Sequence, residues 1–242
     1  MKKKDFLTNT IIAHRGIHHT FLENTLLAFE EAIKNHYTIE LDVRLTKDRE
    51  IIVFHDSNLK RIFDINRDIN DLTLEEIKKY KYIPTFLEVL QLVNGKVPII
   101  IELKIDNRYF VLERKLVELL DCYKGEFSVQ SFHPLTLWWF RLNRSHYIRG
   151  YLVHNILFSN FFLRIFLNQK LLKKILKPDY IGVNLIGLKE NYIQKLRYKY
   201  LVIGYTINSN YEYLEYKGLA DNFIFNIEKQ ETVPLRTVSQ KE

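Results

Sequence analysis

The sequence is poor in cysteine and glycine, and it has no long apolar run. Its single cysteine, Cys122, excludes an internal disulfide and fits a reducing compartment. No stretch of about 18 uncharged apolar residues occurs, so we expect no transmembrane helix. The lysines at positions 2–4 are not followed by an apolar run of signal length, which predicts a cytoplasmic protein.

What the chain does contain is a large apolar fraction and an excess of basic residues. Of its 242 residues 47% are hydrophobic and 14% aromatic, which favours one large domain spanning residues 1–242. The formal net charge of +7 suggests an anionic partner, such as a phosphate substrate or an acidic lipid surface. The lysines are scattered and form no stripe interleaved with aromatics, so we expect no nucleic-acid partner.

Residues 39–56 hold two apolar, β-branched runs on either side of a polar centre. Only residues 43–50 separate Asp42 from the second run, too few for a parallel crossover, so the runs should form an antiparallel hairpin. With a turn at residues 47–48, the strand alternation puts four side chains on one face, with Glu40 opposite His55 and Asp42 opposite Val53. Two carboxylates and an imidazole would thereby meet. Acids on a strand commonly form a solvated, salt-bridged face, but the buried character of these strands favours a functional site.

The rest of the chain alternates between strand and helix patterns. Further strands are expected at 11–13, 97–103, 127–132, 147–153, 180–184, 201–206 and 223–225. When the return strand of the hairpin is set aside, eight strands remain with helical segments between them. This alternation predicts the α/β class and a parallel (β/α)8 TIM barrel with a β-hairpin excursion. The alternative is a doubly wound open sheet, which would need Gly-rich phosphate loops that a chain with eight glycines lacks.

Charged side chains gather where a barrel places its site, at or next to the carboxyl ends of strands. They are His14, Arg15, Glu40, Asp42, His55, Glu102 and Lys104. Three carboxylates in one small space need a divalent cation, and oxygen ligands select Mg²⁺ or Ca²⁺. Two histidines can serve as base and acid, while an arginine and a lysine hold an anionic substrate. The set predicts cleavage of a phosphodiester.

The same residues lie in motifs that resemble the glycerophosphodiester phosphodiesterase family of the PLC-like phosphodiesterase superfamily. The motifs are, in order, His14-Arg15-Gly16, Glu23-Asn24-Thr25, Glu40-x-Asp42, His55-Asp56, Glu102-x-Lys104 and Gln130-Ser131-Phe132. The strong resemblance covers residues 11–132, and it implies a barrel with a small insertion at about residues 56–81.

The resemblance also implies a role for each site residue. Metal ligands would be Glu40, Asp42 and Glu102, the acid and base His14 and His55, and the phosphate contacts Arg15 and Lys104. The implied reaction is metal-dependent hydrolysis of glycerophosphodiesters to glycerol phosphate and an alcohol. Two alternatives stay open: a lysophospholipase D-type enzyme that acts on membrane lipids, and a catalytically silent barrel that binds phosphodiesters.

One stretch, residues 153–177, carries more apolar residues than a barrel helix needs. Beside the arc suited to the barrel wall, a second apolar set lies next to lysines: Phe162, Leu163, Phe166 and Leu167 with Lys170, Lys173, Lys174 and Lys177. Such a pattern is typical of a helix that contacts an anionic membrane. It is also compatible with a helix that neighbouring loops or a second subunit cover, and this explanation is slightly favoured. Both explanations stay open.

Overall fold

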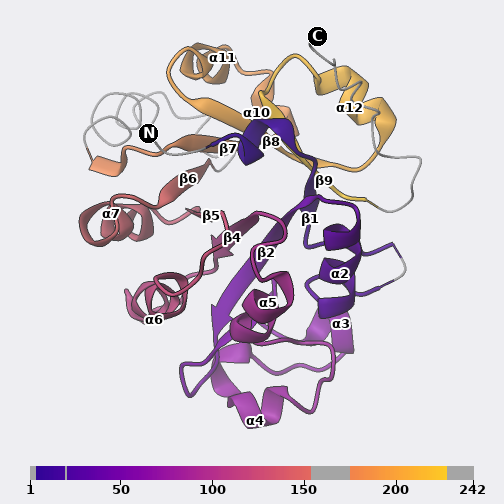
Figure 1. Ribbon diagram of the computed structural model, residues 1–242, viewed down its shortest axis with the longest axis vertical. Helices are drawn as coiled ribbons and strands as arrows, with labels where there is room; N and C mark the ends of the chain where they lie inside the picture. The colour runs from indigo at the N-terminus through magenta and orange to yellow at the C-terminus, as the bar shows by residue number, and fades with distance from the viewer. Residues whose placement is uncertain (1–3, 20, 154–174, 228–242) are drawn as a thin grey trace.

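The structure, a computed structural model, describes residues 4–19, 21–153 and 175–227. Within these ranges eight parallel strands form a barrel with helices on its outside (Figure 1). The strands are β1 (Ile12–His14), β2 (Thr38–Leu45), β4 (Ile99–Leu103), β5 (Phe127–Ser131), β6 (Ile148–Val153), β7 (Tyr180–Asn184), β8 (Leu201–Ile207) and β9 (Asn222–Phe225). A ninth described strand, β3 (Ile51–Val53), pairs antiparallel with β2.

The described helices connect these strands. They are α1 (Phe6–Asn9), α2 (Leu26–Lys34), α3 (Lys60–Phe63), the 3-10 helix η1 (Ile69–Asp71), α4 (Leu74–Ile77), α5 (Phe86–Val93), α6 (Val111–Leu120), α7 (Pro134–Asn143), α10 (Leu185–Leu188), α11 (Asn191–Arg197) and α12 (Asn210–Tyr216). The sheet runs in the order β1-β9-β8-β7-β6-β5-β4-β2, and a parallel β1–β2 pairing closes the ring. The predicted (β/α)8 barrel with a hairpin excursion is confirmed.

Inward-facing positions of the strands change from apolar to polar along the barrel axis. Near the amino ends the interior holds a cluster of buried residues: Phe6, Leu7, Ile12, Ile100, Ile148, Tyr180, Ile203 and Ile224. Two residues further on, β1 presents His14 and β4 presents Glu102, because alternate residues share a face. The Asn222 amide donates to the carbonyl oxygens of Leu7 and Thr10, each at 2.9 Å, which anchors α1 at the amino end. The barrel interior is thus apolar near the amino ends of the strands, and the polar side chains His14 and Glu102 lie at the carboxyl ends.

The hairpin forms, but its register differs by one residue from the predicted one. Val43 pairs with Val53 and Leu45 with Ile51, so Val53 lies on the opposite face from Asp42. The reason is the turn: it has three residues between Thr46 and Glu50, whose backbones pair at 3.0 Å, and Arg49 adopts a left-handed conformation with φ 66°. The predicted pairings of Glu40 with His55 and of Asp42 with Val53 are wrong.

Residues 54–83 form a small unit beyond the barrel wall, and Figure 1 shows α4 at one end of the long axis of the molecule, with α3 between it and α2. This unit and β3 share a separate apolar cluster of buried residues: Ile52, Phe54, Leu59, Ile69, Leu72, Ile77 and Ile83. It occupies the region of the predicted insertion at 56–81. The extent of the single domain, residues 1–242, stays a prediction.

Arg108, in the loop after β4, links this unit to the hairpin. Its guanidinium donates to the carbonyl oxygens of Thr46 (2.7 Å) and Leu45 (3.2 Å) and to the side chain of Asn70 in η1 (2.9 Å). Arg108→Ala removes all three of these hydrogen bonds and should lower the free energy of unfolding by about 1–3 kcal/mol. Urea denaturation measures this, with the exposed Arg114→Ala as control. Equal stability of the two variants would contradict the link.

The described residues contain no helix long and apolar enough to cross a membrane. The predicted membrane-contacting stretch, 153–177, falls almost wholly on residues 154–174, which lie outside the described residues. That contact and the cytoplasmic location stay predictions.

Candidate active site

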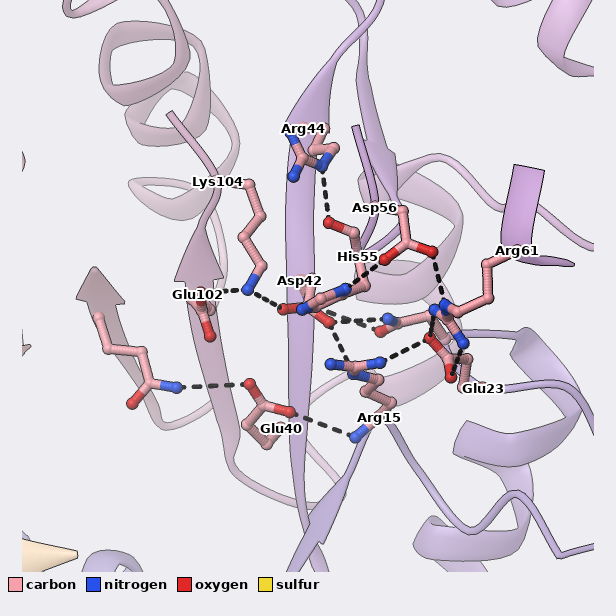
Figure 2. Close-up of polar contacts among 12 residues, drawn as sticks. Arg15, Glu23, Glu40, Asp42, Arg44, His55, Asp56, Arg61, Glu102 and Lys104 are labelled. Carbon is pink, nitrogen blue, oxygen red and sulfur yellow. Dashed lines mark hydrogen bonds and ion pairs between the residues drawn. The ribbon is translucent and has the colours of Figure 1, made fainter. Parts of the chain in front are cut away.

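All seven residues singled out in the sequence lie at the carboxyl end of the barrel. His14 ends β1, Glu40 and Asp42 lie on β2, and Glu102 lies on β4; Arg15 and Lys104 directly follow their strands, and His55 lies two residues beyond β3. The strand register aligns His14 with Glu40 and Asp42 with Glu102. Figure 2 shows the charged groups from these strands facing one another.

Three carboxylates form the centre of this group. Glu40, Asp42 and Glu102 are 2%, 1% and 7% exposed, so water screens them little. One oxygen from each lies within 4.8 Å of the others. Among the described residues this set has the composition and spacing of a metal site, with oxygen as the sole donor element.

The pKa values of two of these carboxyl groups show how poorly their negative charge is compensated. Burial, together with the negative charges of Asp42 and Glu102, raises the pKa of Glu40 well above its usual range. Burial likewise raises the pKa of Glu102 to about 7, although Lys104 opposes this. Arg15 and Lys104 lie nearby, but their charge does not offset burial and the repulsion among the carboxylates, and a bound cation would supply further positive charge. The residues present therefore fit Mg²⁺ or Ca²⁺.

Two cationic side chains converge on Asp42. Lys104 Nζ lies 3.1 Å from Asp42 Oδ1 and also pairs with Glu102, and Arg15 Nε lies 3.2 Å from Asp42 Oδ2. Burial acts to raise the pKa of Asp42, but Lys104 and Arg15 outweigh it and hold the pKa below its usual range. These two groups supply fixed positive charge at the mouth of the barrel.

Asn24 belongs to the site although sequence reasoning gave it no role. Its Nδ2 donates to Asp42 Oδ2 at 2.9 Å, and its Oδ1 accepts from the backbone N–H of Asp42 at 3.3 Å. Asn24 itself is buried and left-handed, with φ 56°. Its place in the Glu-Asn-Thr motif just after β1 was the available signal.

His55 reaches the site through contacts made after β3 ends. Its carbonyl oxygen accepts from Arg44 Nε at 2.8 Å, and the backbone N–H of Phe54 donates to the carbonyl oxygen of Asp42 at 3.0 Å. The His55 ring contacts Asp56 through Nδ1 and Oδ1 at 2.6 Å. Burial acts to raise the pKa of Asp56, but hydrogen bonds from Arg61 and His55 lower it, so the ionised carboxylate accepts and Nδ1 donates.

Arg61, from α3, connects the His55–Asp56 pair to Glu23. Its Nε donates to Asp56 Oδ2 at 2.6 Å, and its terminal nitrogens donate to both oxygens of Glu23 at 2.9 and 2.6 Å (Figure 2). Glu23 in turn accepts from Arg15 at 2.7 Å. Sequence reasoning missed this network, because 38 residues separate Arg61 from Glu23.

His14 sits deeper than His55. Burial, and next the charge of Arg15, lower the pKa of its imidazole to about 3, so the ring is neutral at physiological pH. Its Nδ1 is buried and has no hydrogen-bond partner among the described residues. The His18 ring lies edge-on to it, with 6.5 Å between centroids. A neutral imidazole has a free ring nitrogen that can accept a proton, and negative charge entering the site would favour that transfer by offsetting Arg15.

The chain is similar in sequence to known phosphodiesterases and lysophospholipases. The chain is 36% identical over 141 residues to a glycerophosphodiester phosphodiesterase of Bacillus altitudinis, covering 51% of this chain and 58% of that protein. It is 35% identical over 156 residues to lysophospholipase D GDPD1 of Homo sapiens, covering 57% and 46%. The chain thus spans about half the length of the curated relatives it matches.

Solved structures match over most of both chains. The crystal structure of a glycerophosphodiester phosphodiesterase from Thermotoga maritima has a TM-score of 0.75 at 26% identity, covering 91% of this chain and 96% of that one. A phosphodiesterase from Oleispira antarctica, in complex with the product sn-glycerol-3-phosphate, has a TM-score of 0.77 at 22% identity, covering 92% and 94%. The second likeness concerns the fold alone.

A family model matches most of the barrel. The model of the glycerophosphoryl diester phosphodiesterase family matches residues 14–219, which begin at His14 and include every residue of the site described above. This chain therefore belongs to the glycerophosphoryl diester phosphodiesterase family.

Proposed function

We propose that the protein hydrolyses glycerophosphodiesters to glycerol phosphate and an alcohol with the help of a divalent cation. The observation that carries the proposal is the convergence of three buried carboxylates with two histidines at the carboxyl end of one barrel. Membership of the family supports the same reaction. The product bound to the Oleispira antarctica phosphodiesterase supports glycerol phosphate as the released phosphate ester.

Three groups of the site would bind and orient the substrate. Glu40, Asp42 and Glu102 would hold Mg²⁺ or Ca²⁺, which when bound polarises a phosphoryl oxygen and neutralises developing charge. Arg15 and Lys104, which neutralise Asp42 in this structure, would pair with the remaining phosphate oxygens. The fixed backbone of Arg15 and its contact with Glu23 keep the guanidinium in place.

The two histidines would move the protons. His14, neutral because burial and Arg15 lower its pKa, would accept a proton from water as the water oxygen bonds to phosphorus. Burial, Lys104 and Arg15 lower the pKa of His55, while Asp42 and the hydrogen bond to Asp56 oppose them. His55 would therefore act as the proton donor once the substrate phosphate has raised its pKa. As the phosphorus–oxygen bond to the alcohol breaks, His55 donates to the leaving oxygen. An anionic phosphate between the rings raises the pKa of both.

A second candidate is a lysophospholipase D-type reaction on membrane lipids. It is favoured by the likeness to the human lysophospholipase D, and its chemistry at phosphorus is the same. A catalytically silent barrel is disfavoured, because every proposed ligand and proton-transfer group is present and lies at the carboxyl end of the barrel or just beyond β3.

Release of choline or ethanolamine tests the proposal directly. We expect the purified protein to release them from glycerophosphocholine or glycerophosphoethanolamine, to lose this activity in EDTA, and to regain it on addition of Mg²⁺ or Ca²⁺. Lysophosphatidylcholine in the same assay distinguishes the second candidate. Full activity in EDTA would contradict the cation, and inactivity on all three substrates with both metals would favour the silent barrel.

A further inference from the structure

Tyr180, on β7, lies fully buried inside the barrel below the carboxylate cluster. Its neighbours across the sheet explain how it fits: Gln130, Gly150 and Tyr180 stand level on β5, β6 and β7. A Cβ on Gly150 would lie 2.2 Å from the tyrosine ring. Because Gly150 has no side chain, the ring leans across β6 and its hydroxyl reaches β5.

The Tyr180 hydroxyl contacts two polar side chains of β5. It donates to Gln130 Oε1 at 3.1 Å, and it lies 3.2 Å from the Ser128 hydroxyl. Burial raises the pKa of Tyr180 far above its usual range, so the hydroxyl keeps its proton. With that proton given to Gln130, the phenol oxygen accepts from Ser128.

This contact decides which end of the Gln130 amide faces the metal site. Since Gln130 Oε1 accepts from Tyr180, its Nε2 points to Glu40 and donates to Glu40 Oε1 at 3.4 Å. The other oxygen, Glu40 Oε2, accepts from the backbone N–H of Arg15 at 3.3 Å, as Figure 2 shows. Both oxygens of this carboxylate are thereby held. With the amide reversed, its oxygen would face the ionised carboxylate that the cation requires, and two acceptors would then meet.

We infer that Tyr180 is a positioning residue for the metal site: through the Gln130 amide it orients Glu40 for the cation. The inference rests on the proposed cation at Glu40, Asp42 and Glu102. Groups that hydrogen-bond to metal ligands fix their orientation, and their loss typically weakens metal binding by about 10- to 100-fold. Tyr180 thus contributes to metal affinity without touching metal or substrate.

The test is the affinity of the protein for Mg²⁺ and Ca²⁺ alone, measured by isothermal titration calorimetry without substrate. Tyr180→Phe keeps the ring and removes only the hydroxyl, so we expect a folded protein whose Kd rises about 10- to 100-fold. Gln130→Ala should weaken binding by a similar factor. The double variant should be no weaker than Gln130→Ala, because Tyr180 acts only through Gln130.

Tyr151→Phe is the matched control, since Tyr151 is also buried but follows Gly150 on β6 and points to the other face of the strand. Its Kd should equal that of the native protein. An unchanged Kd in Tyr180→Phe, or effects of Tyr180→Phe and Gln130→Ala that multiply, would overturn the inference. Should Tyr180→Phe fail to fold, an unchanged Kd in Gln130→Ala would overturn it equally. If the native protein binds neither cation, the proposed metal site itself fails, and this inference falls with it.

Discussion

Replacing Glu40, Asp42 or Glu102 by alanine is expected to abolish cation-stimulated hydrolysis while the barrel stays folded. Each carboxylate is buried and within reach of the other two, so each variant loses one of three ligands. A cation at a phosphoryl oxygen stabilises the transition state by several kcal/mol, and its loss should lower kcat by at least about 10²-fold. Initial rates at increasing Mg²⁺ or Ca²⁺ measure the effect.

The fold should tolerate these changes, because three converging carboxylates repel one another and removing one relieves that repulsion. Circular dichroism melting in EDTA should therefore give a midpoint no lower than that of the native protein for Glu102→Ala. The control is Glu118→Ala, an exposed carboxylate on α6, which should keep full activity. Full activity in any one of the three site variants would contradict the proposal that all three carboxylates bind the cation.

His14→Ala and His55→Ala should each lower kcat by about 10²–10⁴-fold, the usual contribution of a well-placed general acid or base. The two rings stand on separate elements, one at the end of β1 and one beyond β3, so each supplies one proton transfer that the other cannot. Steady-state kinetics at saturating metal and substrate separate this loss of kcat from weaker binding.

His146→Ala serves as the control, since this exposed histidine precedes β6 at the amino end of the barrel. Its kcat should match that of the native protein. A large loss in only one of the two site variants would mean that the two-histidine scheme is wrong and that another group carries the second proton.

Several elements of the fold could be predicted because their signals are local. The strand at residues 180–184 was predicted with the bounds that β7 has, and α5 begins at a capping sequence that is equally local, Thr85-Phe86-Leu87-Glu88. In the structure Thr85 accepts from the Glu88 N–H, and Glu88 accepts from the Thr85 N–H, which forms a capping box. Such patterns depend on neighbours along the chain, so tertiary context changes them little.

The register of the hairpin could not be predicted from the local sequence. Its two strands were predicted, but a two-residue turn was assumed where the chain makes a three-residue turn with Arg49 left-handed. No glycine stands at position 49 to signal that conformation. His55 nevertheless reaches Asp42, because the chain leaves the strand after Val53 and Arg44 then holds the His55 carbonyl.

The sequence by itself determined the barrel and the seven polar residues at its carboxyl end. Hydrophobic periodicity defines strands and helices, and parallel strands bring their carboxyl ends to one side. Only the tertiary structure decided which groups hold those residues: Arg61 binds Glu23 across 38 residues, and Tyr180 reaches Gln130 across 50. Such contacts depend on which strands are neighbours and on where a missing side chain, at Gly150, leaves room inside the barrel. No spacing along the chain encodes that proximity.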